Sequence, residues 1–105
     1  MINVILESPY AGDIERNVEY ARKCVKDSLL RGEAPIASHL LYTQDGILDD
    51  DIQSERRLGI DAGHAWRFVA KKFVFYTDYG WSKGMDKALQ LVKAMGAEFE
   101  FRKIL

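Results

Sequence analysis

The sequence predicts a single α/β domain, a three-layer sandwich in which helices cover both faces of a mainly parallel sheet. Three observations predict this class. Apolar runs typical of strands alternate along the chain with segments whose apolar residues recur at helical spacing. The chain of 105 residues is long enough for one domain, residues 1–105, and leaves no length for a second. The predicted helices are also long enough to serve as right-handed crossovers between parallel strands.

The first half of the chain contains two predicted strands and one helix. Residues 2–6 form a nearly continuous apolar run, which is typical of a strand buried on both faces. Asp13 offers a cap to a helix of about five turns, and Gly32 is suited to a positive φ beyond its end. Residues 34–37 are a short strand candidate that its proline restricts to a sheet edge or a strand start. Residues 38–51 form a long polar and aromatic connection, the kind of loop that often carries function.

The second half repeats the pattern with two helices and two strands. A helix is predicted from residue 50 or 51 to about residue 71, and small residues on one face would let it approach the sheet closely. Residues 72–77 form the most strand-like run in the chain. Ser82 can cap a third helix that ends at Gly96. Residues 98–102 alternate polar and apolar, which is typical of an edge strand with one wet face.

This order of elements predicts a flavodoxin-like, Rossmann-like sheet of four strands in the order 2-1-3-4. In such sheets, ligands bind outside the carboxyl ends of the strands, where the chain reverses direction from the first strand. That rule nominates three segments as the candidate site, and they are residues 8–13, 39–51 and 77–85.

Composition narrows the classes of partner. A net charge of -1 gives no basic footprint, so polymeric DNA or RNA is not an expected partner. No apolar run approaches the ~20 residues of a membrane span, the N-terminus lacks a signal-peptide pattern, and Cys24 cannot form an internal disulfide. These features predict a cytoplasmic protein.

No cofactor or metal is expected. The sequence lacks the dinucleotide-binding and P-loop fingerprints and the residue spacings of zinc sites. The acidic run Asp49, Asp50 and Asp51 is interpreted as the start of a helix.

The first nominated segment brings several ligand-binding groups to the predicted crevice. Ser8, Pro9 and Tyr10 supply a hydroxyl, a turn and an aromatic ring ahead of the first helix. Free amides at a helix start attract anions, but Asp13 is a competing anion there. A carboxylate at this place suits the hydroxyl and amino groups of a ribose or base better than a phosphate. The alternative is a simple turn in which Asp13 only caps the helix.

The other two segments add polar groups at the same end of the sheet. His39 follows the second strand and could donate to a phosphate or a base, or serve a structural role alone. Asp78 directly follows the third strand and could accept hydrogen bonds from a ribose. Ser82, Lys83 and the amides near Gly84 could receive a phosphate, the alternative being an ordinary turn and helix cap.

Short motifs spread over nearly the whole chain together resemble a known family. The chain is similar to small bacterial and phage proteins related to nucleoside 2-deoxyribosyltransferases. That resemblance implies a flavodoxin-like fold, homo-oligomers and binding of small nucleosides or nucleotides, and it adds Asn17 and Met85 to the ligand-binding candidates. The motifs are Ser8-Pro9-Tyr10, Gly12-Asp13, Arg16-Asn17, Ala34-Pro35-Ile36-Ala37, His39-Leu40-Leu41, Leu48-Asp49-Asp50-Asp51, Glu55-Arg56, Gly59 and Ser82-Lys83-Gly84-Met85.

The chain departs from this family at the nucleophile. In the transferases and the related deoxynucleotide N-hydrolases, a glutamate four residues after the glycine of S-x-G-x-x-x-E attacks the anomeric carbon of the sugar. Here the glycine is Gly84 and the fourth residue onward is Ala88. The remaining catalytic candidates are Asp78, which resembles the family's ribose-holding aspartate, and Asp86, which points about 160° away from Ala88 on a helix.

The sequence therefore predicts a binder of nucleotide-type ligands on a transferase-like scaffold that lacks its nucleophile. One version is a phage anti-defence protein, a sponge that sequesters a nucleotide-derived immune signal. The alternative is an active deoxyribosyltransferase or N-glycosidase that uses another carboxylate. A third class, a structural subunit or interaction module, predicts no pocket at the strand ends. Because so small a domain offers only a shallow crevice, a second copy is expected to complete it.

Overall fold

Four strands form one parallel sheet in the computed structural model of the protein, which describes residues 1–105. The sheet order is β2-β1-β3-β4, and all three neighbouring pairs run parallel. The predicted order 2-1-3-4 and the flavodoxin-like class are therefore confirmed. The strands are β1 (Ile2–Glu7), β2 (Glu33–Ile36), β3 (Lys72–Tyr76) and β4 (Glu98–Arg102).

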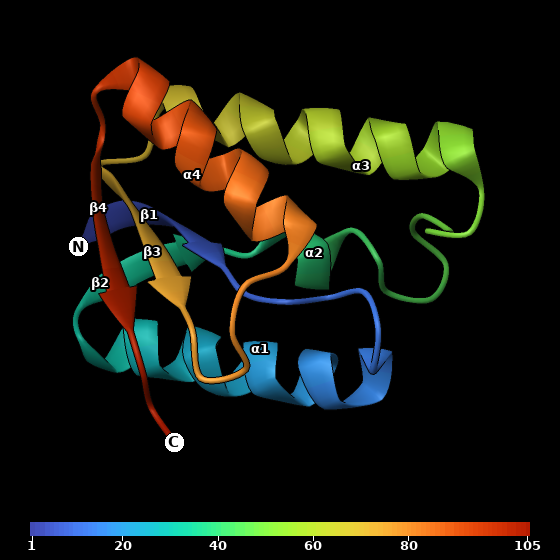
Figure 1. Cartoon of the computed structure of the whole chain (residues 1–105), viewed down its shortest axis with the longest axis horizontal. Coiled ribbons are helices and arrows are strands. Elements are labelled where there is room, and N and C mark those ends of the chain that lie inside the picture. The colour runs from blue at the N-terminus through green and yellow to red at the C-terminus, as the bar shows by residue number, and fades with distance from the viewer.

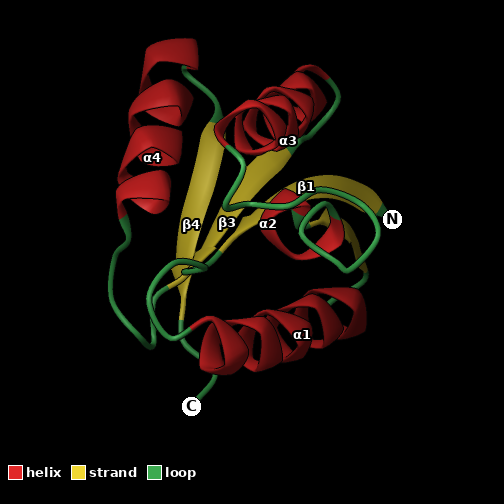
Figure 2. Cartoon of the chain, turned by 90° about the vertical axis from the view of Figure 1, so that its right-hand side faces the viewer, coloured by secondary structure: helices red, strands yellow, loops and turns green.

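The helices lie on both faces of this sheet, as Figures 1 and 2 show. On one face lies α1 (Ile14–Leu30), and on the other lie α3 (Gln53–Ala65) and α4 (Lys83–Met95). The short α2 (Ser38–Leu41) follows β2 and contacts both α1 and α3. A turn of 3-10 helix, η1 (Trp66–Phe68), continues from α3. None of the helices combines the length and the apolar character that a membrane span requires.

The hydrophobic core consists of two clusters, one on each face of the sheet. Successive side chains of a strand point to opposite faces, so β1 and β3 contribute alternately to both clusters. In β1, Val4, Ile5 and Leu6 are all buried, which confirms a strand covered on both sides. The α1 face holds Val4, Leu6, Tyr20, Cys24, Ala37, Val74 and Tyr76. The α4 face holds Ile5, Phe73, Phe75, Met85, Ala88 and Val92.

Two predicted helix caps form as expected. The side chain of Asp13 accepts a hydrogen bond from the amide of Arg16 at 3.2 Å at the start of α1. Ser82 accepts one from the amide of Met85, also at 3.2 Å, at the start of α4. Gly32 takes a φ of 85° after α1, a conformation that costs other residues steric strain. The sequence thus determines these boundaries locally.

The second predicted helix is wrong in its extent and in its packing. It ends at Ala65 rather than near residue 71, and its small residues do not approach the sheet. Gly63 instead faces α2, where an added Cβ would lie 2.5 Å from Oγ of Ser38 and 2.9 Å from its Cβ. The helix α2 itself occupies part of the segment that we expected to be a loop. Because α3 packs mainly on α2, it projects past the sheet (Figure 1).

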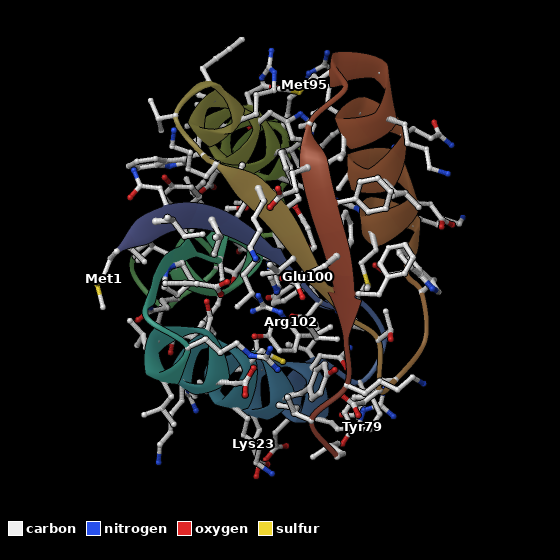
Figure 3. The ribbon with its side chains drawn as sticks, turned by 90° about the vertical axis from the view of Figure 1, so that its left-hand side faces the viewer. Met1, Lys23, Tyr79, Met95, Glu100 and Arg102 are labelled. Atoms are coloured by element: carbon white, nitrogen blue, oxygen red, sulfur yellow. The ribbon has the colours of Figure 1, made fainter.

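The polar face of β4 also differs from its expected orientation. Alternation predicts a wet polar face, yet Arg102 is only 5% exposed and points toward α1, whereas Phe101 on the opposite face is 53% exposed. The Arg102 guanidinium binds both oxygens of Glu33, at 2.8 and 2.6 Å, and Oε1 of Glu100 at 2.7 Å. Lys72 completes the group with a 2.6 Å contact to Glu100. Figure 3 shows Glu100 and Arg102 close together beside β4. Four charges thus compensate one another, and we call Glu33, Lys72, Glu100 and Arg102 the charge network.

The charge network sets the protonation of its two carboxyl groups. Hydrogen bonds from Arg102 are the main reason that the pKa values of Glu33 and Glu100 both fall to about 2. Both groups therefore stay ionised well below neutral pH. Ser28 adds a further hydrogen bond to Glu33 at 2.7 Å from within α1. The network joins the two edge strands of the sheet to the helix that covers them.

Candidate functional site

A cavity of about 490 Å³ lies over the carboxyl end of β1. This volume is in the range of small-molecule sites, and the position is the one that the parallel sheet favours for ligands. Five parts of the chain contribute: the end of β1 with its loop, α2, the segment after α2, α3, and the start of α4. The lining residues are Glu7, Ser8, Tyr10, Ala11, Gly12, Ser38, His39, Tyr42, Thr43, Leu48, Asp50, Glu55, Arg56, Gly59, Ile60, Ser82, Lys83, Gly84 and Met85.

Six of the predicted ligand-binding residues line this cavity together. They come from three separate segments of the sequence, which the ends of the strands bring side by side. They are Ser8, Tyr10, His39, Ser82, Gly84 and Met85. Pro9, Asp13, Asn17 and Asp78, which were predicted with them, are not among the lining residues.

Ser8 and His39 form a hydrogen-bonded pair within the cavity wall. Ser8 Oγ and His39 Nε2 lie 2.6 Å apart, and Ser8 is only 4% exposed. Burial lowers the pKa of His39 to about 4, so its imidazole is neutral at physiological pH. No carboxylate forms a hydrogen bond with the other ring nitrogen, so the third member of a catalytic triad is missing. The pair joins α2 to the loop after β1 and presents a neutral polar surface.

Glu7 is a lining residue that the sequence analysis did not identify. It is the last residue of β1, and its carboxyl group forms no hydrogen bond or ion pair with any other residue. Burial raises its pKa to about 8. Glu7 is therefore mainly protonated at neutral pH. One sequence signal marks it, because a carboxylate directly follows an apolar strand and precedes the nominated loop.

Two cations line the cavity from its α3 and α4 sides. Arg56 and Lys83 are lining residues, and neither takes part in an ion pair. Beside Lys83, the first turn of α4 presents free backbone amides, which favour an anion. At Gly84 an added Cβ would meet only Oγ of Ser82, at 3.8 Å, so a ligand can approach the backbone closely there. This side of the cavity is suited to a negatively charged group.

Carboxylates line the cavity as well. They are Asp50 and Glu55, of which Glu55 Oε1 accepts a 3.1 Å hydrogen bond from the amide of Asp49. The amide of Asp51 donates to Oδ1 of Asp49 at 3.0 Å, so the acidic run forms a compact turn before α3. No three His, Cys, Asp or Glu side chains gather closely enough to hold a metal ion.

Asn17 and Asp13 support the loop after β1 without lining the cavity. Asn17 is 1% exposed, and its amide nitrogen donates to the backbone oxygens of Tyr10 at 2.9 Å and Ala11 at 3.1 Å. Asp13 accepts from the Arg16 amide as the cap of α1. Asn17 therefore holds Tyr10 in place and Asp13 fixes the start of α1, so a ligand would depend on them only indirectly.

Asp78 lies away from the cavity and binds the C-terminal segment. Its Oδ2 accepts a hydrogen bond from the Tyr20 hydroxyl at 2.6 Å, and its carboxylate accepts from the amides of Ile104 and Leu105, with shortest distances of 3.0 and 2.9 Å. Burial opposes its ionisation, but these hydrogen bonds hold the pKa of Asp78 below its usual value. Its acceptor sites are thus taken by the protein itself, which removes the geometry expected for holding a ribose.

Neither of the two predicted catalytic candidates, Asp78 and Asp86, lines the cavity. Asp86 lies in the first turn of α4, is exposed and is not a lining residue. Ala88 is 4% exposed within the apolar cluster that includes Met85 and Val92. A methyl group packed in the core therefore occupies the position four residues after Gly84.

The fold and site together define a flavodoxin-like α/β domain whose ligand-sized cavity contains unpaired cations, neutral polar groups and a buried carboxyl group. The chain belongs to a family described as a domain of unknown function (DUF7768), whose model matches residues 2–102. No curated protein and no solved structure shows a significant match to the chain.

Proposed function

We propose that the protein binds a small nucleoside or nucleotide in the cavity over β1. One observation carries this proposal: two unpaired cations and a helix start lie in the same 490 Å³ cavity as two tyrosine rings and neutral hydrogen-bonding groups. A nucleotide combines an anionic phosphate, a polar sugar and a flat aromatic base, so it needs this mixture of partners. The resemblance to deoxyribosyltransferase-like proteins supports the same ligand class.

Each part of such a ligand has a chemical counterpart. Lys83, Arg56 and the amides at the start of α4 take the phosphate. Tyr10 and Tyr42 offer aromatic surface to the base or the sugar. Because Ala88 replaces the nucleophile, the ligand is held without being cleaved. A protein of this kind would act as a sink for its ligand, as expected of a phage sponge for a nucleotide-derived immune signal.

Calorimetry with nucleosides, their 5′-monophosphates, ADP-ribose and cyclic dinucleotides tests this function. We expect Lys83→Met to weaken binding of phosphorylated ligands about tenfold, because one charge-assisted contact contributes about 1.5 kcal/mol. Nucleosides, which lack the phosphate, should bind the variant as they bind the wild type. The matched control is Lys87→Met, since Lys87 lies one turn along α4 and does not line the cavity. Absence of binding up to about 1 mM for every ligand would contradict the proposal.

A second candidate function is cleavage of an N-glycosidic bond. Its supporting observation is Glu7, a carboxyl group enclosed in the cavity, whereas Asp78 and Asp86 lie outside. Incubation with deoxynucleosides and deoxynucleotides, followed by chromatography for the released base, distinguishes cleavage from binding. Turnover that disappears in Glu7→Ala and persists in Asp86→Asn would favour the enzyme over the binder.

We also propose that the protein forms a homo-oligomer through α3 and η1. Leu58 is 59% exposed, Phe68 75% and Val69 56%, although all three are large and apolar. The helix α3 projects past the sheet, and two of its residues next to Leu58, Gly59 and Ile60, line the cavity. A second copy packed against α3 would therefore also extend the cavity wall. Light scattering should give a multimer for the wild type and a monomer for the double variant Leu58→Glu, Phe68→Glu. A monomeric wild type would contradict it.

A further inference from the structure

The helices α2 and α3, the segment between them and η1 pack on one another as one unit, residues 38–68, which we call the α2–α3 unit. Gly63 of α3 lies so close to Ser38 of α2 that an added Cβ would meet Oγ of Ser38 at 2.5 Å. The indole of Trp66 donates a hydrogen bond to the Tyr42 hydroxyl at 3.0 Å. Figure 1 shows the loop that joins the two helices lying beyond the end of the sheet. These contacts fix α3 to α2 and not to the sheet.

Few interactions join the α2–α3 unit to the rest of the domain. No ion pair involves it. Apart from bonds to the residues next to it in the chain, one hydrogen bond crosses its boundary, between His39 Nε2 and Ser8 Oγ at 2.6 Å. Leu40 packs partly against the apolar cluster on the α1 face, and Gly63 is the one buried residue of the unit. The unit is therefore attached mainly at α2, and a segment with so few buried contacts is suited to motion.

The cavity lies between the α2–α3 unit and the rest of the domain. The unit supplies one wall, which includes Tyr42 and Arg56. The loop after β1 and the start of α4 supply the other wall, which includes Tyr10 and Lys83. A rotation of the unit about its two chain connections would change the width of the cavity and leave the sheet and the core clusters intact. Clefts between two such bodies are where hinge closure around ligands occurs.

We propose that the α2–α3 unit is a hinged lid that closes over the ligand in the cavity. A ligand that contacts both walls favours the closed state, because only that state makes both sets of contacts. Closure brings Arg56 of the unit nearer to Lys83 of α4 and encloses the ligand, so that release requires the lid to reopen. The closing step rests on the proposed function, whereas the hinge follows from the contacts of the free protein.

Distances between spin labels, measured by pulsed electron paramagnetic resonance, test the lid. One pair of labels joins α3 to α4, at Arg57→Cys and Lys87→Cys. The matched control pair joins α1 to α4, at Lys26→Cys and Lys87→Cys. All these positions are exposed and outside the cavity lining, and the native Cys24 is buried. Labelled protein is diluted with unlabelled protein, so that only distances within one chain are measured.

The free protein tests the hinge. Its α3–α4 distance distribution should be at least about twice as wide as the α1–α4 distribution, because hinge motion moves α3 and leaves α1 and α4 fixed on the sheet. Ser8→Ala should widen the α3–α4 distribution further, since it removes the one hydrogen bond that crosses to the unit. Ser54→Ala, at an exposed serine of α3, should leave it unchanged. An α3–α4 distribution as narrow as the control would overturn the lid.

Added nucleotides test the closure. Adenosine monophosphate or ADP-ribose should shorten and narrow the α3–α4 distances and leave the α1–α4 distances unchanged. Unchanged α3–α4 distances with a nucleotide that calorimetry shows to be bound would overturn closure and leave the proposed function intact. Absence of any nucleotide binding would overturn the proposed function, and the widths in the free protein would still decide whether the unit is hinged.

Discussion

The α1 face of the sheet and the cavity over β1 both contain carboxyl groups. Those on the α1 face are paired with cations of the chain, whereas the one in the cavity is not. In the charge network, Glu33 and Glu100 share Arg102 and Lys72, and their pKa values fall to about 2. In the cavity, Glu7 has no partner, and its pKa rises to about 8. The first arrangement pairs each of its four charges within the chain, although Nε of Arg102 is buried without a hydrogen-bond partner. The second is incomplete, which is typical of a site that a ligand completes.

The largest expected effect on stability comes from disrupting the charge network. Arg102→Met should lower the free energy of unfolding by about 3–5 kcal/mol, because it leaves the buried Glu33 carboxylate without its main partner. Urea unfolding followed by circular dichroism measures the change. Lys103→Met, at the exposed neighbouring position, should change stability by less than about 0.5 kcal/mol. A loss below about 1 kcal/mol for Arg102→Met would show that the network contributes little.

A smaller effect concerns the wall of the cavity. Gly63→Ala places a Cβ 2.5 Å from Oγ of Ser38, so it should force α3 away from α2 and cost about 1–3 kcal/mol. Gly84→Ala meets only an atom at 3.8 Å, so it should leave stability equal or raise it by about 0.5–1 kcal/mol through helix propensity. Thermal unfolding compares the two variants. Equal stability would contradict close packing of α3 on α2.

The smallest expected effect on stability comes from replacing Glu7, the carboxyl group in the cavity that has no partner. Glu7→Gln should stabilise the protein by about 2 kcal/mol at pH 6, because the Glu7 carboxyl group is ionised there in the unfolded chain but resists ionisation in the fold. At about pH 3.5, where Glu7 is protonated in the folded and the unfolded protein alike, the two proteins should unfold together. The readout is the midpoint of thermal unfolding against pH. An equal stabilisation at both pH values would point to a packing effect instead of ionisation.

The direction of the wild-type pH profile follows from the same groups. Glu7 has a raised pKa, so its contribution is lost as pH rises from about 4.5 to 8. His39 has a lowered pKa and must stay neutral, so stability is lost as pH falls from 6.5 to about 4. Glu33 and Glu100 have lowered pKa values, and their contribution is lost as pH falls from 4.5 to about 2. Between about pH 4.5 and 6.5 the opposite effects of Glu7 and His39 cancel, so stability should be greatest in that range and decline on both sides.

Local patterns predicted most of the fold. The runs around Ile5 and Phe73 have strand character, and Asp13 and Ser82 cap the helices that follow, so the strand order emerges from crossover rules. The short α2 was missed, because a helix of four residues shows no periodicity. The packing of β4 was also missed. Its Arg102 points inward because Glu33, 69 residues earlier in the chain, supplies the opposite charge.

The candidate site was predicted by position more successfully than by residue. The rule for parallel sheets located the cavity, and six nominated residues line it. Asp78 was predicted as a site residue because it follows β3. Its carboxylate instead binds the Tyr20 hydroxyl and the amides of residues 104 and 105, and no local sequence pattern reveals these partners. Glu7 was missed because its significance lies in a lack of partners. Hydrogen-bond and ion-pair partners depend on which residues the fold brings together, so the pattern of a strand does not predict them.

The contact between Trp66 and Tyr42 gives the cavity an optical reporter. The indole N–H of Trp66 donates to the Tyr42 hydroxyl at 3.0 Å, and Tyr42 lines the cavity. Trp81, the second tryptophan, packs instead against Phe75 and Phe101, at ring distances of 5.5 and 5.2 Å. Tryptophan emission of the unlabelled protein should therefore change when the cavity fills, and Trp66→Phe should reduce that change. Occupancy can then be followed in solution without a chromophore on the ligand.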